Sequence, residues 1–177
     1  GFSLYTELLE RAVRALREGR IPELDADARR HTEVELHLPA LIPDDYLGDV
    51  HTRLMLYKRI ASAPDDEGLD RLTEEMVDRF GVLPPQTANL FQVARLRLRA
   101  AALGIRKLEL GALGGRVLFF PNPPVDALVV IRMVQKLPKV YALDGPDKLK
   151  VRLELPGAAE RLRTAGDILR VLGGQSG

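Results

Sequence analysis

The N-terminal part of the chain combines one amphipathic pattern with a polar stretch. Over residues 2–18 apolar residues recur at helical spacing, and Gly19 follows as a stop signal. Residues 20–30 (RIPELDADARR) are polar with a single proline, which is typical of a linker. The pattern therefore predicts a helix and linker over residues 1–30 and a separate domain over residues 31–174. The apolar positions of this helix are Leu4, Leu8, Leu9, Ala12, Val13 and Leu16.

One strand and three helices are predicted next. Residues 32–38 (TEVELHL) alternate between apolar and polar side chains, the period of a strand with one buried face. After a proline-containing turn, Asp49 is suited to cap a helix over residues 50–61. A third helix closes at Gly81, and residues 86–103 predict a long fourth helix. The third helix keeps a narrow apolar stripe made of Leu69, Leu72, Met76, Val77 and Phe80.

After residue 104 the pattern changes to short strands. Residues 105–110 and 115–120 predict a hairpin, because the turn-forming glycines of GALGG lie between them. The rest predicts strands over residues 140–144 and 149–155 and helices over residues 125–136 and 158–172. Helices come first and strands mostly later. The expected fold class is therefore α+β: a small mixed or antiparallel sheet with helices segregated against it, preceded by the N-terminal helix.

Composition narrows the classes of protein to consider. A chain of 177 residues with 46% hydrophobic and 29% charged residues is long enough to form a folded core. A net charge of +1 creates no global field that would recruit nucleic acid or a membrane surface. The absence of cysteine fits a reducing compartment, and we expect a cytoplasmic protein without a membrane partner. Because the chain starts at Gly1, we expect it to be part of a longer protein.

Motifs for catalysis and nucleotide binding are absent from the sequence. There is no GxxxxGK[ST] phosphate loop, and the GALGG cluster lies between two predicted strands instead of before a helix. GxSxG and HExxH are absent as well, and the few serines have no histidine nearby in sequence. We therefore expect no catalytic residue and no cofactor in this segment.

Four residues in and just before the first predicted strand have side chains of metal-ligating types. At strand spacing, His31, Glu33, Glu35 and His37 point to one face, about 7 Å apart along the strand. A pair could share a metal only with bent geometry. The interpretation we favour is the solvent face of a half-buried strand, so no metal site is expected.

Basic residues gather in and after the fourth predicted helix. No aromatic side chains are interleaved with them for base stacking. Two interpretations stay open: a solvated helix face, or an accessory module that contacts nucleic-acid phosphates. The candidate contacts are Arg95, Arg97, Arg99 and Arg106, with Lys107 beside them.

The third predicted helix breaks a local electrostatic rule. Glu75 and Asp78 fall opposite the apolar stripe and are adjacent on the helix surface. Both lie near the C-terminal end, where the helix dipole disfavours a carboxylate by about 0.3 to 1 kcal/mol. Either Arg71 and Arg79 offset these acids on an ordinary surface helix, or the acids form a contact patch for a basic partner.

Several long segments together resemble one family. They include GFSLYTELLERAV, TEVELHLPALIPDDYL, VHTRLMLYKRIASA, DRFGVLPP and ARLRLRAAALGIRKLEL. Together with YALDGPDKLK they cover nearly the whole chain and are similar to the C-terminal region of bacterial transcription-repair coupling factor. The sequence departs from relatives around residues 111–130 and in its short tail.

The resemblance implies a regulatory role. The parent protein of this family is an ATP-driven DNA translocase that displaces stalled RNA polymerase and recruits the repair protein UvrA, and its ATP and magnesium motifs lie upstream of this segment. The C-terminal domain is expected to mask the N-terminal UvrA-binding module of the same chain. The positions that match the family's masking contact are Glu75 and Asp78. Residues 1–30 would then be the helix and linker that leave the last motor domain.

Overall fold

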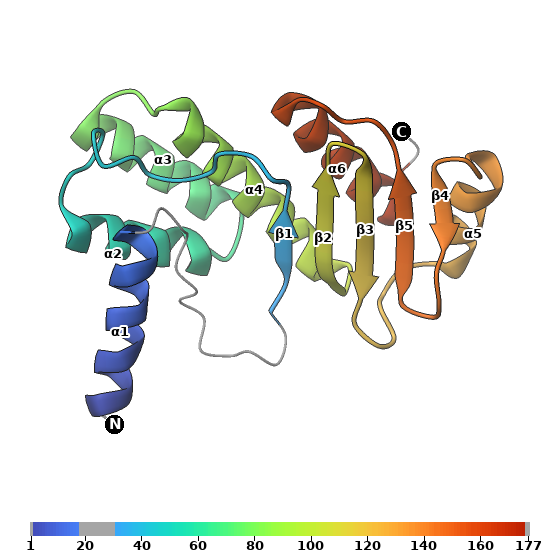
Figure 1. The fold of residues 1–177 in the computed structure, drawn as a ribbon, viewed down its shortest axis with the longest axis horizontal. Helices are drawn as coiled ribbons and strands as arrows, with labels where there is room; N and C mark the ends of the chain where they lie inside the picture. The colour runs from blue at the N-terminus through green and yellow to red at the C-terminus, as the bar shows by residue number, and fades with distance from the viewer. Residues whose placement is uncertain (1, 18–30, 176–177) are drawn as a thin grey trace. The chain divides into compact units, whose positions relative to one another are not determined.

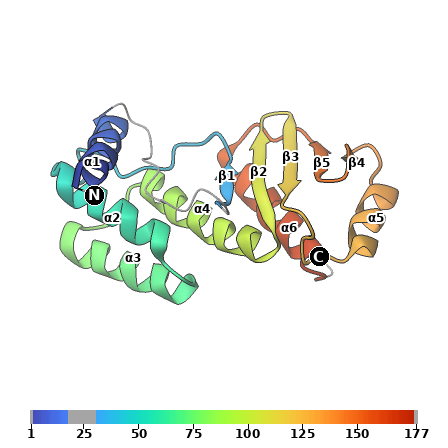
Figure 2. The ribbon, with the colours of Figure 1, turned by 90° about the horizontal axis from the view of Figure 1, so that it is seen from below.

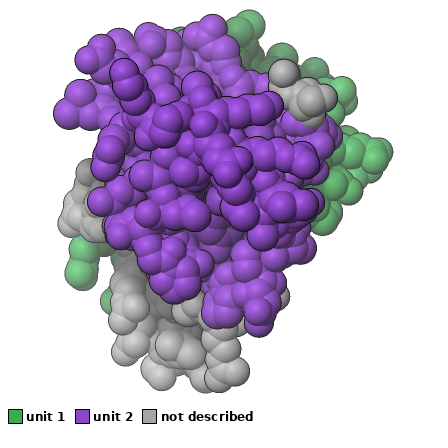
Figure 3. Space-filling model, turned by 90° about the vertical axis from the view of Figure 1, so that its right-hand side faces the viewer, with its two compact units in different colours: residues 1–28, 39–95 green, residues 29–38, 96–177 purple. Residues whose placement is uncertain are grey.

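The computed structural model describes residues 2–17 and 31–175. Contacts divide the chain into two compact units, residues 1–28 with 39–95 and residues 29–38 with 96–177 (Figure 3). The linker expected over residues 20–30, and the domain boundary at its end, lie outside the described residues. Each unit has its own hydrophobic core.

The first unit is helical. It contains α1 (Phe2–Arg17), α2 (Val50–Ser62), α3 (Asp66–Phe80) and the first part of α4 (Pro85–Ala102) (Figure 1). Asp49 caps α2 by accepting a hydrogen bond from Thr52 N at 3.1 Å, as the sequence predicted, and Asp65 caps α3 in the same way. α2 packs against both α1 and α3. Their buried apolar faces form the core, which includes Leu54, Leu56, Ile60, Leu69, Leu72, Met76 and Phe91.

The second unit is a mixed sheet with helices. Its strands are β1 (Glu33–Glu35), β2 (Ile105–Gly111), β3 (Gly114–Phe119), β4 (Tyr141–Leu143) and β5 (Lys148–Arg152), in the order β1-β2-β3-β5-β4. Only the β1–β2 pair is parallel. α5 (Ala127–Lys136) contacts β4, and α6 (Ala158–Leu172) contacts β2 and lies along one face of the sheet (Figures 1 and 2). The predicted α+β class is confirmed.

The hairpin between β2 and β3 needs glycine. Gly114 has φ of 104°, and a Cβ on it would lie 2.1 Å from Val151 O. A Cβ on Gly115 would lie 1.8 Å from Glu109 O. Because no side chain fits such approaches, the glycines mark where neighbouring backbones pack closely.

Several elements are shorter than predicted, for local reasons. The strand expected over residues 32–38 ends at Glu35, because His37 adopts a φ of 51° and donates its backbone N–H to Glu35 Oε1. The strand expected over residues 149–155 ends at Arg152, and Leu155 N then bonds to Ala112 O at 2.8 Å. The helix expected from residue 125 begins at Ala127, since Asp126 is its N-cap. None of the described helices is long and apolar enough to cross a membrane.

Candidate protein-contact surface on helix α3

Helix α3 has a buried side and a charged side. Leu69, Leu72 and Met76 are at most 4% exposed and hold the helix on the core of the first unit. Val77 was predicted within this stripe but is 40% exposed, because it lies one residue, or about 100°, beyond Met76 around the helix. The other side carries most of the carboxylates of the helix, and their partners decide which of them are available for a second protein.

Glu75 is held inside the first unit. Its carboxylate accepts hydrogen bonds from Arg59 Nη1 at 2.5 Å and Arg59 Nη2 at 3.0 Å, and a third from Arg79 Nη1 at 3.4 Å. The Arg59 guanidinium on α2 is the main reason why the pKa of Glu75 is lowered. Glu75 is therefore half-buried and already neutralised, whereas the sequence pattern had placed it outward.

Asp78 is exposed and has no ion pair or hydrogen bond to its side chain among the described residues. The same is true of Glu74, one helical turn earlier. Residues four apart on a helix are neighbours, so these two carboxylates form one local negative site, which we call the acidic pair. The sequence analysis named Asp78 but missed Glu74. The signal that could have found it is the i, i+4 spacing of the two acids.

The other carboxylates of α3 have cationic partners. Arg71 was expected to offset Glu75, but its guanidinium lies 3.7 Å from Glu67, and the salt bridge is formed there. Arg79 does approach Glu75, as expected, and its guanidinium also stacks over the Phe80 ring at 4.8 Å. These pairs leave only the acidic pair uncompensated within the described part of α3.

Tyr46 anchors the C-terminal end of α3. Its hydroxyl donates to Gly81 O at 2.9 Å and lies 3.4 Å from Met76 O, and its ring meets Phe80 edge-on at 6.2 Å. Burial raises the pKa of the Tyr46 hydroxyl, so it stays a donor at neutral pH. The Gly81 carbonyl lies at the C-cap, where carbonyls lack an intrahelical partner, and the Tyr46 hydroxyl satisfies it. The turn that carries Asp78 is thereby fixed in place.

The predicted basic residues are found in different settings. Arg95 is tied to α3, with Nη2 2.5 Å from Asp70 Oδ1 and Nη1 3.3 Å from Asp66 Oδ1. It belongs to the first unit. The second unit contains Arg97, which is half-buried, and Arg99 and Arg106, which are exposed. Arg95 thus neutralises carboxylates of its own unit.

The residues considered as metal ligands around β1 form contacts with charged side chains of β2. Nε2 of His37 lies 2.8 Å from Glu109 Oε2, and this contact is the main cause of a lowered Glu109 pKa. Glu33 lies 3.9 Å from Lys107 Nζ. Across residues 2–17 and 31–175, no group of three His, Cys, Asp or Glu side chains has the geometry to hold a metal ion.

Comparison with known proteins identifies the family. The model of the TRCF domain matches residues 36–129, a range that contains all of α2, α3 and α4. The chain belongs to the TRCF domain family. It is 45% identical to the transcription-repair-coupling factor of Haemophilus influenzae and 46% identical to that of Escherichia coli, in each case over 172 residues and 97% of this chain.

The chain covers only a small part of these relatives. It spans 15% of the length of each of these two proteins. A solved C-terminal domain of transcription-repair coupling factor shares the fold, with a TM-score of 0.65 at 19% identity, covering 82% of this chain and 97% of that one. The chain thus belongs to the family that the resemblance implied and shares the fold of that C-terminal domain.

Proposed function

We propose that this chain is a non-catalytic regulatory domain that masks the UvrA-binding module at the N-terminus of its own parent chain. By masking that module, it restrains an ATP-driven DNA translocase until the translocase engages stalled RNA polymerase. In this proposal ATP and magnesium belong to the motor domains of the parent, and UvrA, RNA polymerase and DNA are reached through the parent.

The acidic pair carries the proposal. Glu74 and Asp78 are exposed, adjacent and without a cation among the described residues, and Asp78 lies in the last turn of α3, where the helix dipole disfavours a carboxylate. A basic surface that docks here would gain attraction without first breaking an internal ion pair. Glu75 could contribute only by exchanging its bonds to Arg59 and Arg79, so we expect it to orient the surface more than to bind.

The direct test is binding of this chain to the isolated UvrA-binding module. We expect salt-sensitive binding that Asp78→Lys weakens about tenfold or more, since a charge pair is replaced by a repulsion. Glu74→Lys should act in the same direction. Glu67→Lys, which changes an exposed acid at the other end of α3, is the matched control and should bind as wild type does. Equal binding by all three variants would exclude the acidic pair as the contact.

In the full-length parent, the same contact acts as a latch. Replacing Glu74 and Asp78 by alanine should increase UvrA binding and basal ATPase activity, because a latch of a few kcal/mol shifts the population of the masked state. Glu75→Ala tests the residue that sequence reasoning named. Unchanged UvrA binding and ATPase activity in all variants would contradict the masking role.

The second candidate function is an accessory nucleic-acid-binding module. Arg99 and Arg106 are exposed and favour it, whereas Arg95 is engaged with Asp66 and Asp70. Gel shifts of the chain on duplex DNA at several salt concentrations test this alternative. Salt-dependent shifts that Arg99→Ala and Arg106→Ala abolish would favour it over the masking role.

A further inference from the structure

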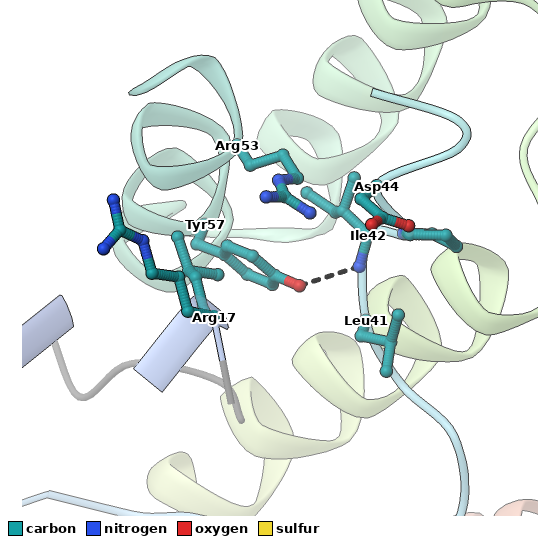
Figure 4. Close-up of a pocket in the computed structure, with 8 residues that line it drawn as sticks. Arg17, Leu41, Ile42, Asp44, Arg53 and Tyr57 are labelled. Carbon is teal, nitrogen blue, oxygen red and sulfur yellow. Dashed lines mark hydrogen bonds between the residues drawn. The ribbon is translucent and has the colours of Figure 1, made fainter. Parts of the chain in front are cut away.

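A pocket of about 430 Å³ lies beside α2 in the first unit (Figure 4). Leu41, Ile42 and Pro43 form part of its apolar lining, and Arg53, Tyr57 and Asp44 supply its polar groups. Figure 4 shows the side chains of these three polar residues converging on the pocket, whereas the guanidinium of Arg17 is turned away from Arg53. The volume is within the range of small-molecule sites.

Arg53 occupies a core position of α2. It shares the buried face of the helix with Leu56, Tyr57 and Ile60, and its relative exposure is 9%. Its Nε is buried and has no hydrogen-bond partner, and no ion pair joins the guanidinium to Asp44 or to any other described carboxylate. A buried N–H without a hydrogen-bond partner is expensive, because its desolvation is not offset by a bond.

Tyr57 supplies a second donor at the same place. Its hydroxyl oxygen accepts the backbone N–H of Ile42 at 2.7 Å, and its own hydrogen has no acceptor among the described residues. Burial is the main reason why the pKa of Tyr57 is raised, so the hydroxyl remains protonated and able to donate at neutral pH. A guanidinium and a hydroxyl, both buried and both with unused hydrogens, suit the several acceptor lone pairs of one oxyanion.

We propose that Arg53 and Tyr57 bind one oxyanion group of a small molecule, a phosphate or a carboxylate. The apolar wall formed by Leu41 and Ile42 would receive the remainder of the molecule. Asp44, exposed at the rim, limits the affinity by repelling the anion. This site is distinct from the acidic pair on α3 and would give the first unit a means of responding to a small anionic ligand.

The test is a titration of the chain followed by nuclear magnetic resonance. Sodium phosphate and sodium acetate are added in separate arms at constant ionic strength, with sodium chloride as the reference salt. We expect a saturable shift of the Ile42 amide, which reports on the Tyr57 hydroxyl, together with the Arg53 Nε–H signal. The arm that saturates at the lower concentration identifies the favoured oxyanion.

Variants assign the effect to the pocket. Arg53→Met should weaken binding about tenfold or more, the loss expected for one charge-assisted pair. Lys58→Met removes an exposed cation from the same helix and should bind as wild type does. Arg53→Lys keeps the charge without the planar fork and should give intermediate affinity, which covers the case in which Arg53→Met does not fold. A non-saturating response in both arms, or wild-type affinity in both Arg53 variants, would overturn the proposal.

Discussion

Helices α2 and α3 differ in which of their charged side chains are buried and which have a partner. On α3, Glu75 is half-buried with two guanidinium partners, while the unpaired Asp78 stands in solvent. On α2, Arg53 is buried and its Nε has no hydrogen-bond partner. Water solvates Asp78 when its partner is absent, so an intermolecular partner is optional for it. Nε of Arg53 is shielded from water, so its missing partner lowers the stability of the fold.

The largest effect is expected at the buried stripe that holds α3 in place. Met76→Ala should lower the free energy of unfolding by about 2 to 5 kcal/mol, because a fully buried side chain leaves a cavity. The neighbouring Val77→Ala, at an exposed position, is the control and should cost about 1 kcal/mol or less. Chemical denaturation measures both. Equal losses would mean that the two sides of α3 are not distinguished by burial.

Replacing Arg53 by an apolar residue should raise the stability of the fold. Arg53→Met replaces a side chain whose Nε is buried without a hydrogen-bond partner by an apolar side chain of similar length, so we expect the free energy of unfolding to rise by about 1 to 3 kcal/mol in phosphate-free buffer. Lys58→Met should change it by about 0.5 kcal/mol or less. A large loss of stability in Arg53→Met would show that the guanidinium is already satisfied in the fold.

Replacing Glu75 measures how much its salt bridge with Arg59 stabilises the fold. Glu75→Gln should lower stability by about 0.5 to 1 kcal/mol at neutral pH, a modest amount because the pair is partly exposed to solvent. Since the folded pKa of Glu75 is lowered, the stabilisation is present above its unfolded pKa of about 4.3 and is lost as pH falls through the folded value. Denaturation of both proteins at pH 7 and pH 3 should show the difference shrinking in acid. A difference that persists at pH 3 would point to packing instead of charge.

The smallest effect is expected at Asp78. Asp78→Asn should leave stability unchanged or raise it by about 0.3 to 1 kcal/mol, because a carboxylate near the C-terminal end of a helix opposes the dipole. High salt should reduce that gain. A clear loss of stability would reveal an internal partner for Asp78 and weaken its assignment to an external contact.

The periodicity of apolar residues in the sequence was enough to predict much of the fold. The helical spacing of apolar residues predicted α6 over residues 158–172, and the glycines of GALGG predicted the β2–β3 hairpin, because both depend on neighbours in the sequence. The ends of β1 and β5 could not be predicted in this way. They depend on the positive φ of His37 and on a bond from Leu155 to Ala112, which form only when distant segments pack.

The sequence by itself determined the α+β class, the family resemblance and the outward position of Asp78, since each is a property of spacing along the chain. Only the tertiary structure decided how the charges are shared. It paired Glu75 with Arg59 of the preceding helix and Arg95 with two carboxylates of α3. It also left Nε of Arg53 buried without a hydrogen-bond partner. Salt bridges depend on distances of a few ångströms between side chains of different elements, and helical spacing contains no information about them.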